Sequence, residues 1–540
     1  MVVDYSVYLV TDSTMIPESS TFLRQVEESI ENGATIVQLR EKTLGTREFI
    51  ARASKVHELT KKKGIPLIIN DRVDVALAVD AEGIHVGQDD MPAATVRELI
   101  GPDKIIGVTC SNVEETQQVC DEGIADYVGL GTVYFTNTKK DTKTPQGTGP
   151  IGVRKMLQVL RKHNTSKSNK SIRSVAIGGI NQTNAAKVLY QCAIPQQSLD
   201  GVAIVSCIMA SEDAAGSTIE LAEVINLTVP WIRKFSNGGP AKLEDKVAAV
   251  QNAKPLVHHI TNNVVKNFSA NVTLAIGASP IMSELAQEYE EFATNIPNLS
   301  LVVNLGTPSD DLMLTFVHAL QIYNKYGKYI VFDPVAGGAT NARLEACRKL
   351  LNAGQPSVIK GNVGEILAIW KLTSSYQVDS DSAGQSLMRG VDSIADLEDD
   401  VVIRIGQEVA QDFRTVVVIT GKTNFVIDGT YAESKSTYIW DVKAPIRASE
   451  LPVTKIQGGH PLMGSITGSG CSLGSTIAAF IASHADGQSK DTNESFNIGE
   501  AVVGAVELYN KAGELAGKET STPGAFMVKF LDKLYELTHT

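Results

Sequence analysis

The chain has 540 residues, which is too long for one ordinary domain and indicates two to four. Hydrophobic residues make up 43% of it and charged residues 20%, so it can bury sizeable cores. The net charge of -12 argues against binding to nucleic acid or to an anionic membrane, because no basic excess exists to release counterions. The six cysteines form no CxxC pair, which argues against a disulfide framework or a zinc ribbon. No signal peptide or long apolar run is present, so we expect a cytoplasmic protein.

Short apolar runs alternate with amphipathic helical stretches through residues 1–235. The expected strands are Val7–Val10, Ile36–Leu39, Leu67–Ile69, Ile84–Val86, Ile105–Val108, Tyr127–Leu130, Val175–Ile177 and Val202–Val205. Helical patterns separate them, as at Thr21–Asn32, Arg47–Lys63, Val113–Glu122, Val153–Lys162 and Asn184–Cys192. About eight such units in this length predict a (β/α)8 TIM barrel, with a doubly wound open sheet as the alternative.

The turn formers of NGGP, residues 237–240, end this pattern and predict a linker at 236–240. Residues 241–540 then form a second domain in which a helix begins at about Lys242. Its expected strands are Ser300–Asn304, Tyr329–Asp333, Ser357–Lys360, Val416–Thr420 and Asn424–Ile427, alternating with helices in another α/β layer structure. The acidic, Ser-rich segment from Ser374 to Asp400 is expected to be a solvent-facing insertion.

Polar residues follow nearly every expected strand of the first half. They include Gln38, Arg40, Lys42, Asn70, Asp71, Asp90, Thr109, Thr136, Thr138, Lys139, Gly179 and Ser206. The strand ends of a barrel meet at one rim, where cations and hydroxyls bind oxyanions and two carboxylates can hold Mg2+ against a pyrophosphate. The rim therefore predicts an enzyme that handles a diphosphate and a separate monophosphate. Ordinary salt bridges at strand ends are the structural alternative.

Five segments of this half together resemble thiamine-phosphate synthase. They are QLREK at 38–42, INDR at 69–72, HVGQDD at 85–90, GLGTVYFTNTKKD at 129–141 and AIGGI at 176–180. The resemblance implies condensation of an aminopyrimidine methyl diphosphate with a thiazole phosphate, releasing pyrophosphate. A thiazole tautomerase-like barrel is a rival that would share AIGGI but should lack the Gln38, Arg40 and Lys42 set and the two aspartates.

The resemblance also implies a role for each rim residue. The pyrimidine diphosphate is expected to be bound by Gln38, Arg40, Lys42, Asn70, Thr109 and Lys139, with Mg2+ ligated by Asp71 and Asp90. The thiazole phosphate is expected on Thr136, Thr138, Gly179, Val205 and Ser206, with the first two on a mobile loop. Thr109 stands where bacterial relatives often carry Ser, a departure that keeps the hydroxyl.

In the second half the segment TGSGC, residues 467–471, precedes an Ala- and Ile-rich helical run. Glycines that open a helix present N–H groups to an anion, and a cysteine there is expected to have a lowered pKa and to accept a proton from an alcohol. A small buried cysteine at a helix start is the structural alternative. His258 and His259 are neighbours in a strand and point to opposite faces, so we expect no shared metal ligation.

TGSGC joins four other segments that resemble hydroxyethylthiazole kinase, of the ribokinase-like superfamily. They are PLVHHITNNVVKNFSANVTLAIGASPIM at 255–282, VFDPVAGGAT at 331–340, IKGNVGEI at 359–366 and VVVITGK at 416–422. The resemblance implies transfer of the ATP γ-phosphoryl group to a hydroxyethyl group. A general sugar or pyrimidine kinase is disfavoured, because that superfamily usually has Asp in place of Cys471.

The residue roles implied for this half are as follows. Cys471 is expected to be the catalytic base, and Mg2+ is expected to be held by Asp333 and Glu365. ATP and phosphate are expected to be bound by Lys360, Asn362, Thr420, Gly468 and Gly470. The thiazole is expected to be bound by Asn262, Val264 and Met282. Lys360 stands where Arg is common, which keeps the charge but loses the bidentate fork.

The two halves fit together because the kinase product is the second substrate of the barrel. The sequence therefore predicts a bifunctional thiamine-biosynthesis enzyme with small-molecule substrates, Mg2+ as cofactor and ATP as co-substrate. Relatives of the kinase half form trimers, which implies a homo-oligomer in multiples of three. A non-catalytic thiazole-binding protein is the alternative from another class, and would require loss of catalytic residues.

Overall fold

The computed structural model describes residues 3–136, 138, 143–144, 147–166, 170–226, 242–373, 376, 397–430, 447–483 and 498–539. These residues form two compact units, one up to residue 226 and the other from residue 242. The expected linker at 236–240 and nearly all of the acidic segment 374–400 lie outside the described residues, so the domain boundary stays a prediction. No helix in the described ranges is long and apolar enough to span a membrane. All six cysteines are free thiols.

The first unit is a closed barrel of parallel strands in chain order, which confirms the TIM-barrel prediction over the open-sheet alternative. The strands are β1 (Val7–Val10), β2 (Ile36–Leu39), β3 (Leu67–Asn70), β4 (Gly83–Val86), β5 (Ile105–Cys110), β6 (Tyr127–Gly131), β7 (Arg173–Ile177) and β8 (Gly201–Ile204). Pairing of β8 with β1 closes the ring, so the carboxyl ends of all the strands share one rim.

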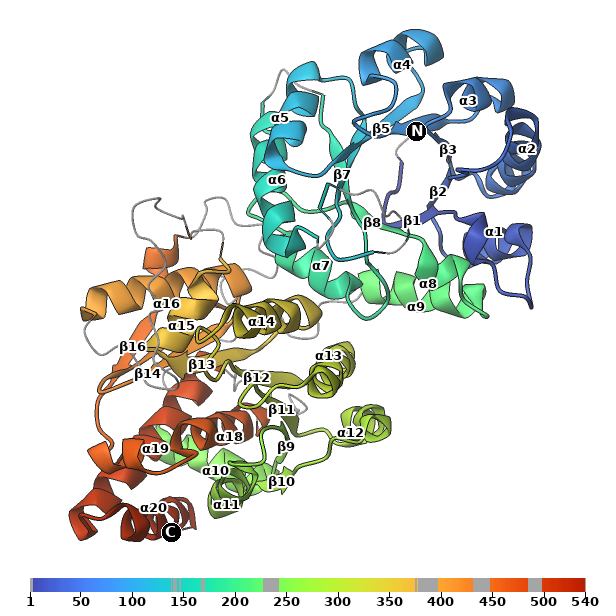
Figure 1. The fold of residues 1–540 in the computed structure, drawn as a ribbon. Coiled ribbons are helices and arrows are strands. Elements are labelled where there is room, and N and C mark those ends of the chain that lie inside the picture. The colour runs from blue at the N-terminus through green and yellow to red at the C-terminus, as the bar shows by residue number, and fades with distance from the viewer. Residues whose placement is uncertain are drawn as a thin grey trace. The chain divides into compact units, whose positions relative to one another are not determined.

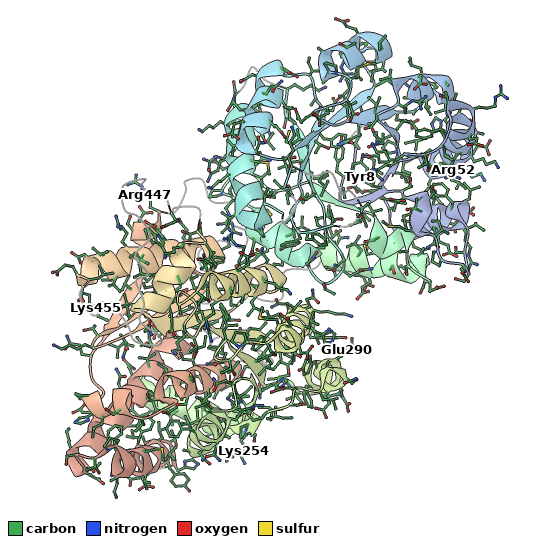
Figure 2. The ribbon with its side chains drawn as sticks, in the orientation of Figure 1. Tyr8, Arg52, Lys254, Glu290, Arg447 and Lys455 are labelled. Atoms are coloured by element: carbon green, nitrogen blue, oxygen red, sulfur yellow. The ribbon has the colours of Figure 1, made fainter. Side chains whose placement is uncertain are left out.

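Helices surround this barrel (Figure 1). They are α1 (Phe22–Glu31), α2 (Thr46–Lys63), α3 (Val73–Val79), α4 (Ala93–Ile100), α5 (Val113–Glu122), α6 (Gly149–Asn164), α7 (Ala185–Cys192), α8 (Ser206–Met209) and α9 (Ala214–Asn226), with a short 3-10 turn η1 (Ser13–Met15). Val7 and Leu9 of β1 belong to the apolar layer between strands and helices, whereas Tyr8 belongs to the cluster inside the ring. Figure 2 shows Tyr8 within the ring and Arg52 on the outer helix α2.

The barrel interior is filled by large side chains, among them Tyr5, Tyr8 and Tyr127. Gly107 of β5 makes room for one of them: a Cβ atom there would lie 2.1 Å from Cζ of Tyr127. The tyrosine ring therefore depends on a glycine in the neighbouring strand, because no other residue leaves this space empty.

The second unit is built on an eight-stranded sheet in the order β10-β9-β11-β12-β13-β14-β15-β16. The strands are β9 (Leu256–Ile260), β10 (Ser279–Ile281), β11 (Leu299–Asn304), β12 (Tyr329–Asp333), β13 (Val358–Asn362), β14 (Val416–Thr420), β15 (Asn424–Asp428) and β16 (Val453–Ile456). The strands from β10 to β14 are parallel, and β15 and β16 each run antiparallel to their neighbour. The parallel strands therefore end at one shared edge.

Helices cover both faces of this sheet (Figure 1). One face carries α10 (Leu243–Ala253), α11 (Lys266–Ala275), α18 (Ser469–Ala482) and α19 (Ile498–Glu519), with α20 (Pro523–His539) packed on α19; the other carries α12 (Tyr289–Asn295), α13 (Asp310–Lys325), α14 (Asn341–Ala353), α15 (Val363–Trp370) and α16 (Asp399–Phe413). Three short 3-10 turns are η2 (Ala286–Glu288), η4 (Ala448–Glu450) and η5 (Pro461–Ser465). The result is a three-layered α/β fold, which confirms the layer structure predicted for this half.

Candidate functional sites

The two cations that follow β2 are held by carboxylates from neighbouring strand ends. Arg40 donates from Nη1 to Oδ2 of Asp12 over 3.4 Å, and its backbone N–H donates to Oγ1 of Thr11 over 3.0 Å. Nζ of Lys42 lies 2.5 Å from Oδ2 of Asp71. The structure thus brings a predicted phosphate-binding lysine into contact with a predicted metal ligand. Asp12, which orients Arg40, was missed from the sequence, although it lies two residues after the segment that predicts β1.

Further polar groups of this rim lie at the ends of β3 and β4, which are neighbours in the barrel. Asp71 follows β3 in a left-handed conformation with φ of 61°, and Oδ2 of Asp90 accepts a hydrogen bond from the Gly87 N–H over 2.8 Å. Nδ2 of Asn70 is buried and has no hydrogen-bond partner among the described residues. An unpaired buried donor at a rim is a group that a ligand can satisfy.

A buried chain of hydrogen bonds links Gln38 to Thr109 through the barrel interior. Nε2 of Gln38 donates to the Tyr8 hydroxyl over 2.9 Å. The Tyr8 hydroxyl in turn lies 2.5 Å from the hydroxyl of Tyr127. The Tyr127 hydroxyl lies 2.9 Å from Nδ1 of His85, whose Nε2 lies 2.8 Å from Oγ1 of Thr109. Burial raises the pKa of both tyrosines, so their hydroxyls stay protonated.

Sequence reasoning missed the tyrosines because no motif marks them, and it passed over His85 although that residue opens the HVGQDD segment. The available signal was the two-residue alternation of the strands, which turns Tyr8 and Tyr127 to the inside of a closed barrel. The chain fixes the orientation of the Gln38 amide and of the Thr109 hydroxyl, since each link constrains the next.

The expected thiazole phosphate site is formed by backbone at the ends of β7 and β8. Gly179 has φ of 68°, and a Cβ atom there would lie 2.6 Å from the carbonyl oxygen of Phe135, so only glycine fits. Its carbonyl accepts a hydrogen bond from Nδ2 of Asn184 over 2.9 Å. Val205 precedes α8, which begins at Ser206. The first N–H groups of a helix have no partner within the helix, so the start of α8 at Ser206 is suited to donate to an anion.

The loop predicted to cover the phosphates is described only in part. Oγ1 of Thr136 accepts a hydrogen bond from the Thr138 N–H over 3.2 Å, so the two threonines lie together. Lys139 lies outside the described residues, and its predicted role stays a prediction.

In the second unit a buried polar cluster lies at the carboxyl ends of β11, β12 and β13. Oδ2 of Asp333 accepts hydrogen bonds from Nζ of Lys360 and from Nδ2 of Asn304, each over 3.0 Å. Oδ1 of Asn304 in turn accepts from Nδ2 of Asn262 over 3.0 Å. Burial alone would lower the pKa of Lys360, but the charges of Asp333 and Glu365 outweigh burial and raise it. Lys360 therefore remains a cation.

Oδ1 of Asp333 is buried and has no hydrogen-bond partner among the described residues. Both carboxylate oxygens of Glu365, by contrast, have partners. Oε1 accepts a hydrogen bond from the Ala336 N–H over 2.9 Å, and Oε2 accepts one from the Asn362 N–H over 2.8 Å. Burial and the nearby charge of Asp333 raise the pKa of Glu365 to about 7. Asn362 caps α15 by accepting the Glu365 N–H.

The segment TGSGC forms the start of α18, as predicted. Gly468 caps the helix with φ of 89°, and a Cβ atom added to Gly470 would lie 3.9 Å from Nζ of Lys360. The helix start and this lysine thus face the same space, where N–H groups and a cation favour an anion.

Cys471 lies in the first turn of α18, but the expected lowering of its pKa is wrong. Burial and the charge of Asp333 raise the pKa of the thiol to about 11, and the opposing effects of Lys360 and the Asn304 amide are smaller. Desolvation disfavours a thiolate more than the helix start favours it, because protein atoms surround much of this half-buried residue.

The predicted thiazole contacts lie at the ends of the neighbouring strands β9 and β10. Oδ1 of Asn262 accepts the Val264 N–H over 3.0 Å, the Val264 side chain is 68% exposed, and Met282 directly follows β10. Thr420 is the last residue of β14. All these positions are at the edge that also carries Asp333.

His258 and His259 point to opposite faces of the sheet, as predicted. Nδ1 of His258 lies 2.6 Å from the Tyr323 hydroxyl of α13, and Nε2 of His259 lies 2.9 Å from Oγ of Ser475 in α18. The two imidazoles cannot share a metal ion. No group of three or more His, Cys, Asp or Glu side chains suited to a metal occurs in the described part of the chain.

The two folds and their strand-end sites define a two-domain enzyme in which a TIM barrel precedes a ribokinase-like domain. Residues 7–208 match the family described as "Thiamine monophosphate synthase", and residues 247–438 and 446–540 match the "Hydroxyethylthiazole kinase family". The chain is 43% identical over 548 residues to the "Thiamine biosynthetic bifunctional enzyme" of Saccharomyces cerevisiae, covering 99% of this chain and 96% of that protein.

Two further relatives agree. The "Probable thiamine biosynthetic bifunctional enzyme" of Schizosaccharomyces pombe is 39% identical over 549 residues, covering 99% of this chain and 95% of the relative. The "Thiamine-phosphate synthase" of Clostridium novyi is 42% identical over 224 residues, covering 42% of this chain and all of the relative. The chain belongs to the family of bifunctional thiamine-biosynthesis enzymes, with a thiamine-phosphate synthase domain followed by a hydroxyethylthiazole kinase domain. Family membership decides against the tautomerase-like barrel and the general sugar kinase.

Proposed function

We propose that each reaction of this enzyme takes place at the strand-end site of one unit. The second unit transfers the γ-phosphoryl group of ATP to the hydroxyethyl group of the thiazole. The barrel joins the resulting thiazole phosphate to 4-amino-2-methyl-5-pyrimidinylmethyl diphosphate, giving thiamine phosphate and pyrophosphate. The observation that carries the proposal is that each unit gathers a lysine, carboxylates and glycines of positive φ at one strand edge.

In the barrel the bond between the pyrimidine methylene and the diphosphate breaks, and the thiazole nitrogen bonds to the methylene. Arg40 and Lys42 would neutralise the charge that develops on the leaving pyrophosphate. Asn70 would donate its unpaired Nδ2 to the diphosphate. Gln38 and Thr109, fixed by the tyrosine chain, would orient the pyrimidine so that its methylene faces the thiazole.

The thiazole phosphate would bind at the other side of the same rim. The backbone at Gly179, Val205 and Ser206 is suited to hold its phosphate, and Thr136 and Thr138 to cover it. Lys139 is proposed to reach the diphosphate from the same loop. This division keeps the two anionic groups apart while their reacting atoms meet.

We propose that a pair of carboxylates would hold Mg2+ at each site. Asp71 and Asp90 would hold it in the barrel, and Asp333 would hold it in the kinase through its unpaired Oδ1. Both oxygens of Glu365 already accept backbone N–H groups, so Glu365 would contribute through water. When bound, the ion supplies positive charge against the phosphate oxygens, and with so few protein ligands it keeps several waters.

In the kinase the start of α18 would receive the transferring phosphoryl group on the N–H groups of Gly468 and Gly470, beside Lys360. Cys471 would accept the proton of the substrate hydroxyl, which requires its thiolate form. Asn362 and Thr420 would lie on the nucleotide side, and Asn262, Val264 and Met282 on the thiazole side. We further propose a cytoplasmic homo-oligomer in multiples of three, to be checked by light scattering of the purified protein.

One assay tests both reactions. Purified protein is incubated with hydroxyethylthiazole, ATP, the pyrimidine diphosphate and Mg2+, and thiamine phosphate, thiazole phosphate and ADP are followed. Thiamine phosphate is expected. Accumulation of thiazole phosphate alone would overturn the barrel assignment, and absence of ADP would overturn the kinase assignment. A non-catalytic thiazole-binding protein would give neither product.

A further inference from the structure

A pair of buried asparagines lies beside the end of β14. The N–H of Gly421, the residue after this strand, donates to Oδ1 of Asn424 over 3.1 Å. Since a backbone N–H can only donate, the Asn424 amide has its oxygen towards the turn and its Nδ2 on the other side. That Nδ2 donates to Oδ1 of Asn510, in α19, over 3.1 Å.

The orientation of the Asn510 amide follows from this chain. Its oxygen must face Asn424 to accept the hydrogen bond, so its Nδ2 must point away. Asn510 is 6% exposed, and its Nδ2 has no hydrogen-bond partner within the described residues. A buried donor without an acceptor costs stability unless a ligand supplies one.

Asn510 is close to the edge where the parallel strands end. Its side chain lies against Gly458, where an added Cβ atom would be 3.9 Å from the Asn510 Nδ2. The preceding residue, Tyr509, donates its hydroxyl to the carbonyl oxygen of Ser469 over 2.6 Å, in the first turn of α18. Consecutive residues of α19 therefore contact the helix start proposed to receive phosphate and Asn424, which begins β15 and accepts from the turn after β14.

We propose that Asn510 is a nucleotide-specificity residue, whose Nδ2 donates a hydrogen bond to a ring nitrogen of the purine base of ATP. This inference rests on the proposed binding of the ATP phosphates at the start of α18. A purine presents N1, N3 and N7 as acceptors, whereas a neutral amide suits an uncharged base better than a phosphate. The residue selects a base by hydrogen bonding and takes no part in phosphoryl transfer.

The first test uses the wild-type full chain. The KM and kcat of thiazole phosphorylation are measured with ATP and with its 1-deaza, 3-deaza and 7-deaza analogues, each of which replaces one ring nitrogen by carbon. We expect one analogue to raise the nucleotide KM roughly tenfold with the KM for the thiazole unchanged, because it leaves the donor unpaired. Equal KM values for ATP and all three analogues would overturn the inference.

The second test uses Asn510→Asp, which keeps the acceptor for Asn424 but replaces the donor by an acceptor. We expect the KM for ATP to rise roughly tenfold in this variant. The deaza analogue that raised the KM of the wild type should have the same KM as ATP in the variant, because the hydrogen bond to that ring nitrogen is already lost. The matched control is Asn298→Asp, at a half-buried asparagine on the opposite edge of the sheet, for which the preference among nucleotides should not change.

If the analogue keeps its full penalty in Asn510→Asp, the base is bound elsewhere and the inference is wrong. Should Asn510→Asp fail to fold, equal KM values of the wild-type chain for ATP and all three analogues would still overturn the inference, because that measurement needs no substitution. Failure of the underlying proposal has a different signature, namely no ADP formation by the wild-type enzyme with any of these nucleotides.

Discussion

At the scale of single residues, Cys471 is the group whose chemistry differs most from expectation. Burial raises its pKa to about 11, so at neutral pH only a small fraction is thiolate. We expect Cys471→Asp to retain or raise the kinase kcat, because a carboxylate is already ionised and can accept the hydroxyl proton. Cys471→Ala should lower kcat by roughly 10²–10³. Initial rates of ADP formation check both, and an alanine variant with unchanged kcat would remove Cys471 from the mechanism.

The raised pKa of Cys471 also predicts a pH dependence. A thiol with a pKa of about 11 gains thiolate as pH rises, by tenfold for each pH unit below that value. Kinase kcat should therefore increase between pH 7 and pH 9 without reaching a plateau. In Cys471→Asp the same profile should be flatter across this range. The measurement is kcat at saturating substrates, with circular dichroism at each pH to show that the fold is intact.

Tyr127 is the residue through which the barrel orients two proposed pyrimidine contacts. Tyr127→Phe removes the hydroxyl that lies between Tyr8 and His85, so the Gln38 amide and the Thr109 hydroxyl lose their shared orientation. We expect kcat/KM for the pyrimidine diphosphate to fall roughly tenfold, in line with the loss of one buried hydrogen bond. Kinase kinetics should not change.

The matched control for this prediction is Tyr5→Phe, since Tyr5 belongs to the same interior cluster and its ring contacts Tyr127. A similar loss of synthase activity in both variants would show that the ring cluster matters and that the hydrogen-bond chain does not.

At the scale of elements, the start of α18 contains two glycines with different roles, Gly468 in the fold and Gly470 in the proposed phosphate site. Gly468 has φ of 89°, and its added Cβ would lie 3.2 Å from Val265, so Gly468→Ala should destabilise the fold by about 1–2 kcal/mol. Gly470→Ala should be tolerated by the fold, because its Cβ would lie 3.9 Å from Lys360 and meet no closer atom.

That methyl group would nevertheless enter the space between the helix start and Lys360. For Gly470→Ala we therefore expect an unchanged Tm and a kinase kcat/KM for ATP reduced roughly tenfold. Thermal unfolding followed by circular dichroism, together with ATP kinetics, distinguishes the two variants. A Gly470→Ala enzyme with full activity would place the phosphoryl group elsewhere.

Strands with a clear apolar run could be predicted from the sequence, and strands without one could not. β1 and β2 agree with their predicted bounds, because their apolar runs are bounded by polar residues. β10 escaped prediction, since it has only three residues and contains Pro280. β16 escaped because it has only four residues and the two in its middle, Thr454 and Lys455, are polar and exposed.

The candidate sites show the same division. Gln38, Lys42, Asp71 and Cys471 could be selected from the sequence because their motifs place them at strand or helix ends. Tyr127 and Asn510 could not, since their significance comes from partners distant in the chain. The direction of the Cys471 pKa was also beyond the sequence, because it depends on how many atoms surround the thiol in the folded protein.

At the scale of the whole molecule, two sites of separate chemistry share one chain, and thiazole phosphate is the compound that connects them. Each unit has its own hydrophobic core and its own strand-end site, so disabling one site should leave the other intact. We expect Cys471→Ala to retain synthase activity on supplied thiazole phosphate. Asp71→Asn should retain kinase activity while it lowers synthase activity by tenfold or more, because it removes a proposed Mg2+ ligand and the partner of Lys42.

An equimolar mixture of Cys471→Ala and Asp71→Asn should then form thiamine phosphate from thiazole, ATP and the pyrimidine diphosphate. The kinase site of one variant releases thiazole phosphate, and the synthase site of the other captures it from solution. We expect a lag before thiamine phosphate appears, which shortens as enzyme concentration rises because the intermediate accumulates faster. If both variants are active on their own substrates but the mixture forms no thiamine phosphate, transfer through solution is excluded and the two sites of one molecule depend on each other.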